Sequence, residues 1–184
     1  MNYATIKYCD IANGPGVRTS LFVSGCTHRC PNCFNEIAWD FGYGQPFTPE
    51  VQQQILESCA PGYVTGLSLL GGEPMEPANQ RALLPFVQAF KQQYPGKTVW
   101  CYSGYTYEQL TGAEPFRCRC EVTDELLALF DVLVDGRFEQ ELYDITLRFR
   151  GSSNQRLIDL PKTRAAGQVT LWQDKAVFST HTMD

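Results

Sequence analysis

The chain has 184 residues, a formal net charge of −5 and a pI near 5.1. This length is enough for one compact domain with a hydrophobic core and too short for two ordinary ones, so we expect a single domain over residues 1–184. The acidic balance argues against a nucleic-acid-binding face, and no stretch approaches the roughly 18 consecutive apolar residues of a membrane helix. We therefore expect a protein or small-molecule partner and, because the start lacks a basic-then-apolar leader, a cytoplasmic location.

Segments typical of strands and helices alternate along the chain. In chain order, the pattern predicts a strand at 19–24, a helix at 49–59, a strand at 64–70, a helix at 79–94, a strand at 97–102, helices from 106 and from 123, a strand at 132–134 and a terminal hairpin at 169–172 and 176–178. Such alternation predicts βαβ units and a parallel sheet. At about 30 residues per unit the chain holds about six units, fewer than the eight of a closed barrel. The predicted fold is therefore α/β, an open, partial (βα)6 barrel.

Residues suited to binding and chemistry follow the predicted strands. Cys26 follows the first strand, Gly71, Gly72 and Glu73 follow the second, and Ser103 and Asp135 end the next two. In parallel sheets and barrels the functional site gathers at the carboxyl ends of the strands. The sequence therefore predicts one shared site at this edge.

The cysteines are predicted to be thiols rather than disulfides, since the cytosol is reducing. Cys26, Cys30 and Cys33 form a C-x3-C-x2-C pattern on one loop. Three thiolates on a tight loop can bind three corners of a 4Fe-4S cluster and leave the fourth iron open. An open metal position is typical of a reactive site rather than a purely structural one.

A zinc site is the alternative for the same loop, because zinc favours four nitrogen or sulfur ligands. Its fourth ligand would come from elsewhere in the chain, and the candidates are His28, Cys9, Cys118 and Cys120. His28 is otherwise expected to be solvated, with a hydrogen bond that tunes the cluster as the alternative. Cys59 and Cys101 are predicted to be small core residues.

Several motifs together resemble a known family. The C-x3-C-x2-C loop resembles the signature of the radical S-adenosylmethionine (SAM) superfamily, and Gly71-Gly72-Glu73-Pro74 is similar to its second-strand motif. The segment 13–18, Asn-Gly-Pro-Gly-Val-Arg, resembles the entry sequence of the glycyl-radical-enzyme activases. The segments 134–138 and 150–156 resemble the branch that activates anaerobic (class III) ribonucleotide reductase. The resemblance covers about residues 2–156 and leaves an extension of about 157–184 unexplained.

The resemblance implies two cofactors, one 4Fe-4S cluster on Cys26, Cys30 and Cys33, and SAM bound at the open iron. It also implies that a reduced cluster splits SAM, and that the resulting 5'-deoxyadenosyl radical takes hydrogen from a glycine of the reductase. The cluster and SAM then carry the chemistry, so no catalytic side chain is predicted. The implied partners are the anaerobic ribonucleoside-triphosphate reductase and an electron donor such as a flavodoxin. The alternatives are another glycyl-radical activase or radical SAM enzyme, and a zinc-stabilised binding module.

The resemblance also assigns residues to SAM and to the partner. The predicted cofactor-binding residues are Asn32, Cys33 and Phe34 beside the adenine, Gly71, Gly72 and Glu73 at the SAM ammonium, and Ser103 and Asp135 for the ribose, the carboxylate or a cation. Phe34 could equally be a core residue, and Ser103 and Asp135 could be turn or cap residues. Arg148, Arg150 and Arg156 are predicted to dock the reductase, with a solvated charged face as the alternative. Segment 13–18 either braces the cluster loop or only connects two strands.

Overall fold

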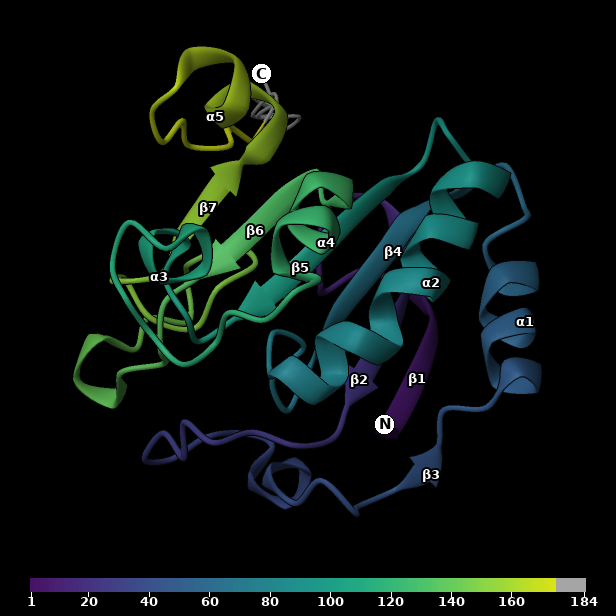
Figure 1. Ribbon diagram of the computed structural model, residues 1–184, viewed down its shortest axis with the longest axis horizontal. Helices are drawn as coiled ribbons and strands as arrows, with labels where there is room; N and C mark the ends of the chain where they lie inside the picture. Colours follow the sequence, from purple (N-terminus) through teal and green to yellow (C-terminus); the bar gives the residue numbers. More distant parts are fainter. Residues whose placement is uncertain (175–184) are drawn as a thin grey trace, which may run out of the picture.

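The computed structural model describes residues 1–174, which form one seven-stranded sheet with helices packed on it (Figure 1). The strands are β1 (Asn2–Asp10), β2 (Val17–Val23), β3 (Gln45–Pro46), β4 (Val64–Gly71), β5 (Thr98–Ser103), β6 (Val132–Asp135) and β7 (Arg156–Asp159). The α-helices are α1 (Pro49–Ser58), α2 (Pro77–Gln93), α3 (Tyr107–Thr111), α4 (Thr123–Leu129) and α5 (Leu160–Ala166), and short 3-10 helices span η1 (Glu36–Trp39) and η2 (Gln140–Leu142).

The sheet is mixed, with the strand order β3-β1-β2-β4-β5-β6-β7. The four inner strands, β2, β4, β5 and β6, are parallel, as predicted from the alternating pattern. Both edges differ from the expectation of about six parallel units, because β1 and β7 run antiparallel to their neighbours. The links before β2 and before β7 contain no α-helix, and a parallel return needs a long crossover connection, usually through a helix.

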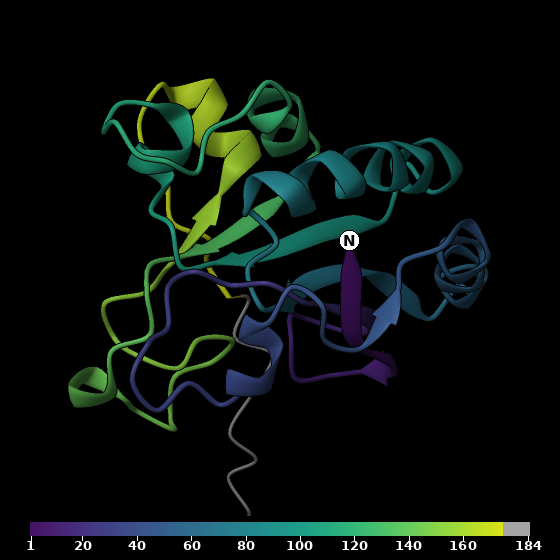
Figure 2. The ribbon, with the colours of Figure 1, turned by 60° about the horizontal axis from the view of Figure 1, so that its bottom comes forward.

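The sheet buries its two faces in different ways. On the helix side, alternate strand residues such as Leu21, Leu69 and Leu133 join a large core with α1, α2 and α4. The other face carries a smaller apolar cluster, formed by Trp100, Val132 and Val134. In Figure 2 the helices lie mainly above the sheet, whereas the loop after β2 and the segment between β6 and β7 lie below it. This second side of the sheet is where the predicted site residues gather.

Helix starts follow their capping signals. Thr48 caps α1 and Pro49 holds its first position, and Thr106 with Gln109 forms the predicted capping box of α3. The helix α2 begins at Pro77, two residues before the predicted start, because Pro is well suited to the first turn of a helix. Consequently Glu76 precedes the helix and lies at the sheet edge that carries the site.

The C-terminal part contains elements that sequence reasoning missed, namely β7 and α5. Instead of starting a hairpin, the segment 169–172 returns to β7, where the Asp159 N–H donates to Thr170 O and the Trp172 N–H donates to Leu157 O. The predicted second arm at 176–178 lies outside the described residues. None of the helices in residues 1–174 has the length and apolarity needed to cross a membrane.

Candidate functional site

The three clustered cysteines lie on a loop that leaves the carboxyl end of β2. We call residues 24–39 the cluster loop. Its ends pair with each other, since the Gly25 N–H donates to Ala38 O at 2.8 Å and the Cys26 N–H donates to Trp39 O at 3.1 Å. Cys26 and Cys30 are buried and Cys33 is half-buried. All three thiols line one pocket of about 610 Å³, which we call the central pocket.

The central pocket brings most of the predicted site residues together. Besides the cysteines, its lining includes Asn32, Phe34, Gly71, Gly72, Glu73, Ser103 and Arg150. The segment 136–155, between β6 and β7, forms the facing wall with Phe138, Tyr143, Leu147 and Phe149. The structure therefore brings this set together in one pocket at the carboxyl ends of the parallel strands. Asp135 is the exception, because it does not line this pocket.

The glycines of the second motif allow the backbone of β4 to approach the cluster loop. Gly71 has a φ of +115°, and the Gly72 N–H donates to Val23 O at 2.7 Å. A Cβ added at Gly72 would lie 2.6 Å from Gly25 O and 2.8 Å from Ala38 O. Both contacts are closer than a side chain tolerates, so glycine is needed here for packing. The motif thus fixes the end of β4 against both ends of the cluster loop.

Glu73 is buried and accepts four hydrogen bonds from the protein. Its Oε1 accepts from the Ser103 hydroxyl and the Met75 N–H, both at 2.8 Å. Its Oε2 lies 2.7 Å from the Gly104 N–H and 3.1 Å from His28 Nε2. A carboxylate offers about four acceptor sites, so these partners fill its capacity. The geometry makes Glu73 a brace between strand ends and cluster loop, and a SAM ammonium would have to share or displace one of these bonds.

The expectation that His28 is solvated is wrong. Its side chain is 6% exposed, its Nε2 faces Glu73, and its ring packs on Tyr105 with the centroids 4.2 Å apart. The His28 carbonyl accepts a hydrogen bond from Arg137. The loop folds back over the strand ends and carries the imidazole inward. Its alternative role, a hydrogen bond that tunes the cluster, stays a prediction, and the observed partner of His28 Nε2 is Glu73.

Phe34 and Asp135 have distinct surroundings. Phe34 is 82% exposed on the rim of the central pocket, so the alternative that it is a core residue is wrong. Asp135 is buried under Arg156, whose Nε donates to Asp135 Oδ1 at 3.0 Å, and it also accepts from the Tyr107 N–H. Its carboxylate therefore already has partners, and it caps the start of α3. That contact favours the structural alternative for Asp135.

The three arginines predicted to dock the reductase do not form one patch. Arg150 lines the central pocket and donates to Gln155 O. Arg148 is exposed and pairs with Asp174, whereas Arg156 bridges Asp135 and Glu108. The hydrogen bond from Arg156 lowers the pKa of Glu108, and the two carboxylates raise the pKa of Arg156. Only Arg150 faces the pocket, so the three arginines have different local roles.

The segment 13–18 connects β1 and β2 and braces the sheet rather than the cluster loop. Arg18 is fully buried, and it donates to the Ser68 hydroxyl at 2.7 Å and to Leu67 O at 2.7 Å. Burial lowers the pKa of Arg18 to about 10. Ser68 in turn donates to Asn13 O, which ties the turn to β4. Asn13 also lines the central pocket, so this link sets one edge of the pocket.

The comparisons with known proteins agree with this site. Residues 12–158 match the family model described as a 4Fe-4S single cluster domain. The chain is 43% identical over 157 residues to a protein of Escherichia coli (strain K12), 42% to one of Pasteurella multocida (strain Pm70) and 37% to one of Enterobacteria phage T4. These alignments cover 84–85% of this chain and 96%, 95% and 93% of the three relatives. Each relative is named anaerobic ribonucleoside-triphosphate reductase-activating protein.

The chain belongs to this family of activating proteins. The resemblance found in the sequence motifs is thereby confirmed. The match to the 4Fe-4S single cluster domain spans residues 12–158, which include the whole cluster loop and both walls of the central pocket. The helix α5 and the segment 169–172 follow the end of the match.

The donor set in this family member fits a 4Fe-4S cluster. Burial raises the pKa of Cys26 to about 12, with the charge of Glu73 as a further cause. Such a thiol binds iron only by losing its proton, which nearby cationic iron favours. Two buried polar groups that line the same pocket, Trp39 Nε1 and the Tyr102 hydroxyl, have no hydrogen-bond partner among residues 1–174. They leave donors free for a polar ligand next to the thiols.

The zinc alternative finds little support in the same contacts. Within the described residues, no three His, Cys, Asp or Glu side chains, the three cysteines of the cluster loop included, gather as a single metal ion requires. Three of the proposed fourth ligands have other surroundings: Cys9 is exposed on β1, the Cys118 thiol donates to Gln109 O, and the Cys120 thiol donates to Gln80 Oε1. His28 does line the central pocket, but its Nε2 faces Glu73. Cys59 and Cys101 are fully buried, which confirms that they are core residues.

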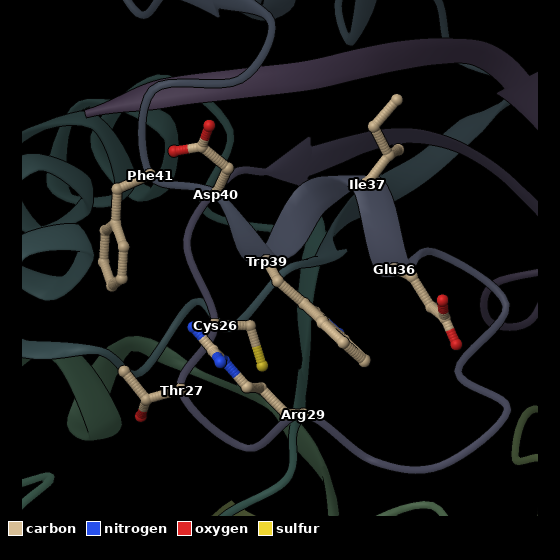
Figure 3. A pocket seen from close by; sticks show the side chains of 8 residues that line it. All are labelled: Cys26, Thr27, Arg29, Glu36, Ile37, Trp39, Asp40 and Phe41. Carbon is tan, nitrogen blue, oxygen red and sulfur yellow. The ribbon is translucent and has the colours of Figure 1, made fainter.

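A second hollow reaches the same thiol from the other side. This outer pocket, of about 780 Å³, is lined by Cys26, Thr27, Arg29, Glu36, Ile37, Trp39, Asp40 and Phe41. Figure 3 shows the Cys26 thiol pointing into the space between Trp39 and Arg29. Trp39 lines both pockets and is therefore part of the wall between them. Sequence reasoning missed Trp39, which has no motif to mark it.

Sequence reasoning also missed three buried residues that support the cluster loop, Glu76, Asn79 and Tyr105. The Asn79 side chain donates to Ser24 O at 3.0 Å and to Glu73 O at 2.8 Å, which joins the loop to the second motif. The sequence did contain a signal for Glu76 and Asn79. Pro77 marks the start of a helix, which places both residues at its first turn, just after the end of β4. Tyr105 carried no such signal, because only the fold brings it to Thr27.

Proposed function

We propose that this chain is a radical SAM enzyme that activates an anaerobic ribonucleoside-triphosphate reductase. Cys26, Cys30 and Cys33 hold one 4Fe-4S cluster, and SAM binds beside it in the central pocket. When bound, the cluster supplies one electron that splits SAM into methionine and a 5'-deoxyadenosyl radical, which takes a hydrogen atom from a glycine of the reductase. A small electron-transfer protein such as a flavodoxin supplies the electron.

One observation carries the proposal. The three thiols and the Gly71–Glu73 motif line the same 610 Å³ pocket, in a chain about 40% identical to proteins named as reductase activators. Three thiolates leave a fourth iron free for a ligand, and a pocket of several hundred Å³ is of the size that small-molecule ligands use. The names of the relatives supply the partner and the reaction class.

The residues of the chain bind, orient and exclude water. Gly71 and Gly72 line the central pocket, and their backbone carbonyls are assigned to the SAM ammonium. Asn32 and the exposed ring of Phe34 stand at the rim and are assigned to the adenine. Holding SAM at a fixed position beside the cluster supplies much of the rate by proximity.

Further parts of the proposal concern Ser103, Asp135, the docking arginines and the fold. Ser103 acts through Glu73, and the assignment of Asp135 to a cofactor stays a prediction. Docking of the reductase by Arg148, Arg150 and Arg156 also stays a prediction, with Arg150 as its leading member because it alone lines the pocket. We also infer that the sheet is an open partial barrel, since its four parallel strands all end at the site.

The test uses single cysteine variants of the anaerobically purified protein. Cys26→Ala, Cys30→Ala and Cys33→Ala are each expected to lose cluster-dependent SAM cleavage and to keep their fold, measured as 5'-deoxyadenosine formed and by circular dichroism. Cys9→Ala is the matched control, since Cys9 is an exposed cysteine on β1 and outside the pocket. The wild type should hold iron and sulfide in a ratio near one. SAM cleavage that persists in any of the three variants, or stoichiometric zinc without sulfide, would overturn the proposal.

A further inference from the structure

Two buried carboxylates hold neighbouring residues of the cluster loop. Glu73 and Glu76 are 1% and 6% exposed, and they are separated by one turn of chain at the start of α2. Glu73 contacts His28, and Glu76 contacts Thr27. Thr27 and His28 directly follow Cys26, so the two contacts fix the loop between its first and second cysteine. Only Glu73 belongs to the motif that marks the site in the sequence.

Of the two carboxylates, Glu76 takes the larger share of its hydrogen bonds from the cluster loop. Its Oε1 accepts from the Thr27 N–H at 2.9 Å and from the Tyr105 hydroxyl at 3.2 Å, and it also accepts from the Thr27 hydroxyl. Arg117 donates to the same Thr27 hydroxyl at 2.8 Å. Two of the three donors to Glu76 therefore come from one loop residue. For Glu73, three of the four donors lie outside the cluster loop.

Helix capping does not account for the Glu76 side chain. Glu76 precedes α2, but its side chain makes no cap hydrogen bond. The N–H groups of Asn79 and Gln80 instead bond to its backbone carbonyl. A buried carboxylate needs compensation, and the positive end of the α2 dipole with three donors supplies it. Its contacts are thus directed at the loop rather than at the helix.

We propose that Glu76 is a positioning residue that holds Thr27 and the adjoining thiols in their cluster-binding arrangement before iron binds. This inference rests on the proposed function in one respect, that Cys26, Cys30 and Cys33 are the cluster ligands. Metal binding to a site that must first be ordered is weakened by the entropy of ordering it. A loop fixed beforehand avoids that loss. The role concerns assembly of the cluster site and not contact with SAM.

The first measurement is amide hydrogen exchange of the metal-free protein. In Glu76→Ala the Thr27 amide is expected to exchange about ten-fold faster or more, because a hydrogen bond to a charged acceptor is lost. Glu76→Gln keeps an acceptor oxygen, so its Thr27 exchange rate should lie between those of the wild type and Glu76→Ala. Glu121→Ala is the matched control. Glu121 is an exposed carboxylate that pairs with Arg81, a residue outside the cluster loop. This variant should leave Thr27 exchange unchanged.

The second measurement is the initial rate of cluster assembly from ferrous iron and sulfide under anaerobic conditions. Glu76→Ala should slow assembly about ten-fold, with substantial rescue in Glu76→Gln. Unchanged Thr27 exchange in a folded Glu76→Ala protein would overturn the inference, and so would faster exchange with an unchanged assembly rate. If the wild type binds no cluster at all, the proposed function fails, whereas Thr27 exchange still reports whether Glu76 holds the loop.

A milder variant covers the case in which Glu76→Ala does not fold. Thr27→Val removes the hydroxyl that joins Glu76 to Arg117 and keeps the backbone N–H bond. It should accelerate exchange of the Thr27 amide and slow cluster assembly by a smaller factor than Glu76→Ala, about two- to five-fold. An assembly rate and an exchange profile equal to those of the wild type would reject the role of this contact.

Discussion

The two walls of the central pocket are held in place by different kinds of contact. The cluster-loop wall is fixed by buried carboxylates and by close backbone packing, through Glu73, Glu76 and Gly72. The facing wall, segment 136–155, is held by aromatic packing on the sheet. Phe149 lies 5.4 Å from Trp100, ring centroid to centroid, and Trp100 lies 5.0 Å from Trp172.

Because the two walls are held by different contacts, substitutions can be expected to affect cluster binding and pocket shape separately. The contacts of Glu73, Glu76 and Gly72 with the cluster loop all lie within residues 12–158, the part matched by the family model. The facing wall also relies on Trp172, which follows that match and packs on Trp100 and Phe149. Changes in the first wall should therefore alter iron binding, and changes in the second should alter stability and pocket shape with the cluster retained.

The largest effect is expected from Trp100→Ala, which removes the residue of β5 on which Phe149 of the facing wall packs. Trp100 is 1% exposed and contacts both Phe149 and Trp172, so its loss should lower the free energy of unfolding by about 3–5 kcal/mol. Iron bound per folded chain should stay near the wild-type value. Urea unfolding and iron analysis measure the two quantities, and Trp100→Phe should recover part of the stability. Loss of iron from folded Trp100→Ala protein would show that the walls are not separable.

An intermediate effect is expected from Gly72→Ala in the cluster-loop wall. The new Cβ would meet the Gly25 and Ala38 carbonyl oxygens at 2.6 and 2.8 Å, so the loop has to shift. Overpacking of this kind costs about 1–3 kcal/mol of unfolding free energy. Unlike Trp100→Ala, this variant should bind less iron per chain. Gly62→Ala is the control, because a Cβ there meets no atom within 4 Å. Full iron binding in Gly72→Ala would contradict the role given to the motif.

The smallest effect is expected at Glu108, at the outer end of the Arg156 bridge. Hydrogen bonding to Arg156 lowers the pKa of Glu108 from 4.5, so the folded state holds its proton more weakly than the unfolded state. Its contribution is present above about pH 4.5 and is lost as pH falls below that value. Glu108→Gln should therefore show a smaller loss of stability between pH 5.5 and pH 3.5, by less than about 1 kcal/mol. Equal acid sensitivity of both proteins in thermal unfolding would contradict this linkage.

Local patterns predicted the inner part of the fold well. The parallel strands, the capped starts of α1 and α3 and the meeting of Cys26, Gly72 and Ser103 at one edge follow from periodicity, caps and the geometry of parallel sheets. The outer part of the sheet was harder to predict, because the antiparallel strands β1 and β7 do not follow from the alternation of strands and helices. The strand β7 contains only two apolar residues, Leu157 and Ile158, whereas β6 of the same length has a run of three and was predicted.

The sequence alone was enough to predict an iron–sulfur protein, which the match to a 4Fe-4S single cluster domain supports. Three cysteines on one loop, and glycines at the end of a strand, need no tertiary information, because their spacing and residue type already limit what they can bind. Tertiary structure decided which polar groups support that loop. Burial of His28, the reach of Glu76 to Thr27 and the packing of Trp172 on Trp100 join residues many positions apart. Such contacts depend on how strands and loops are placed in space, and a local pattern carries no record of that placement.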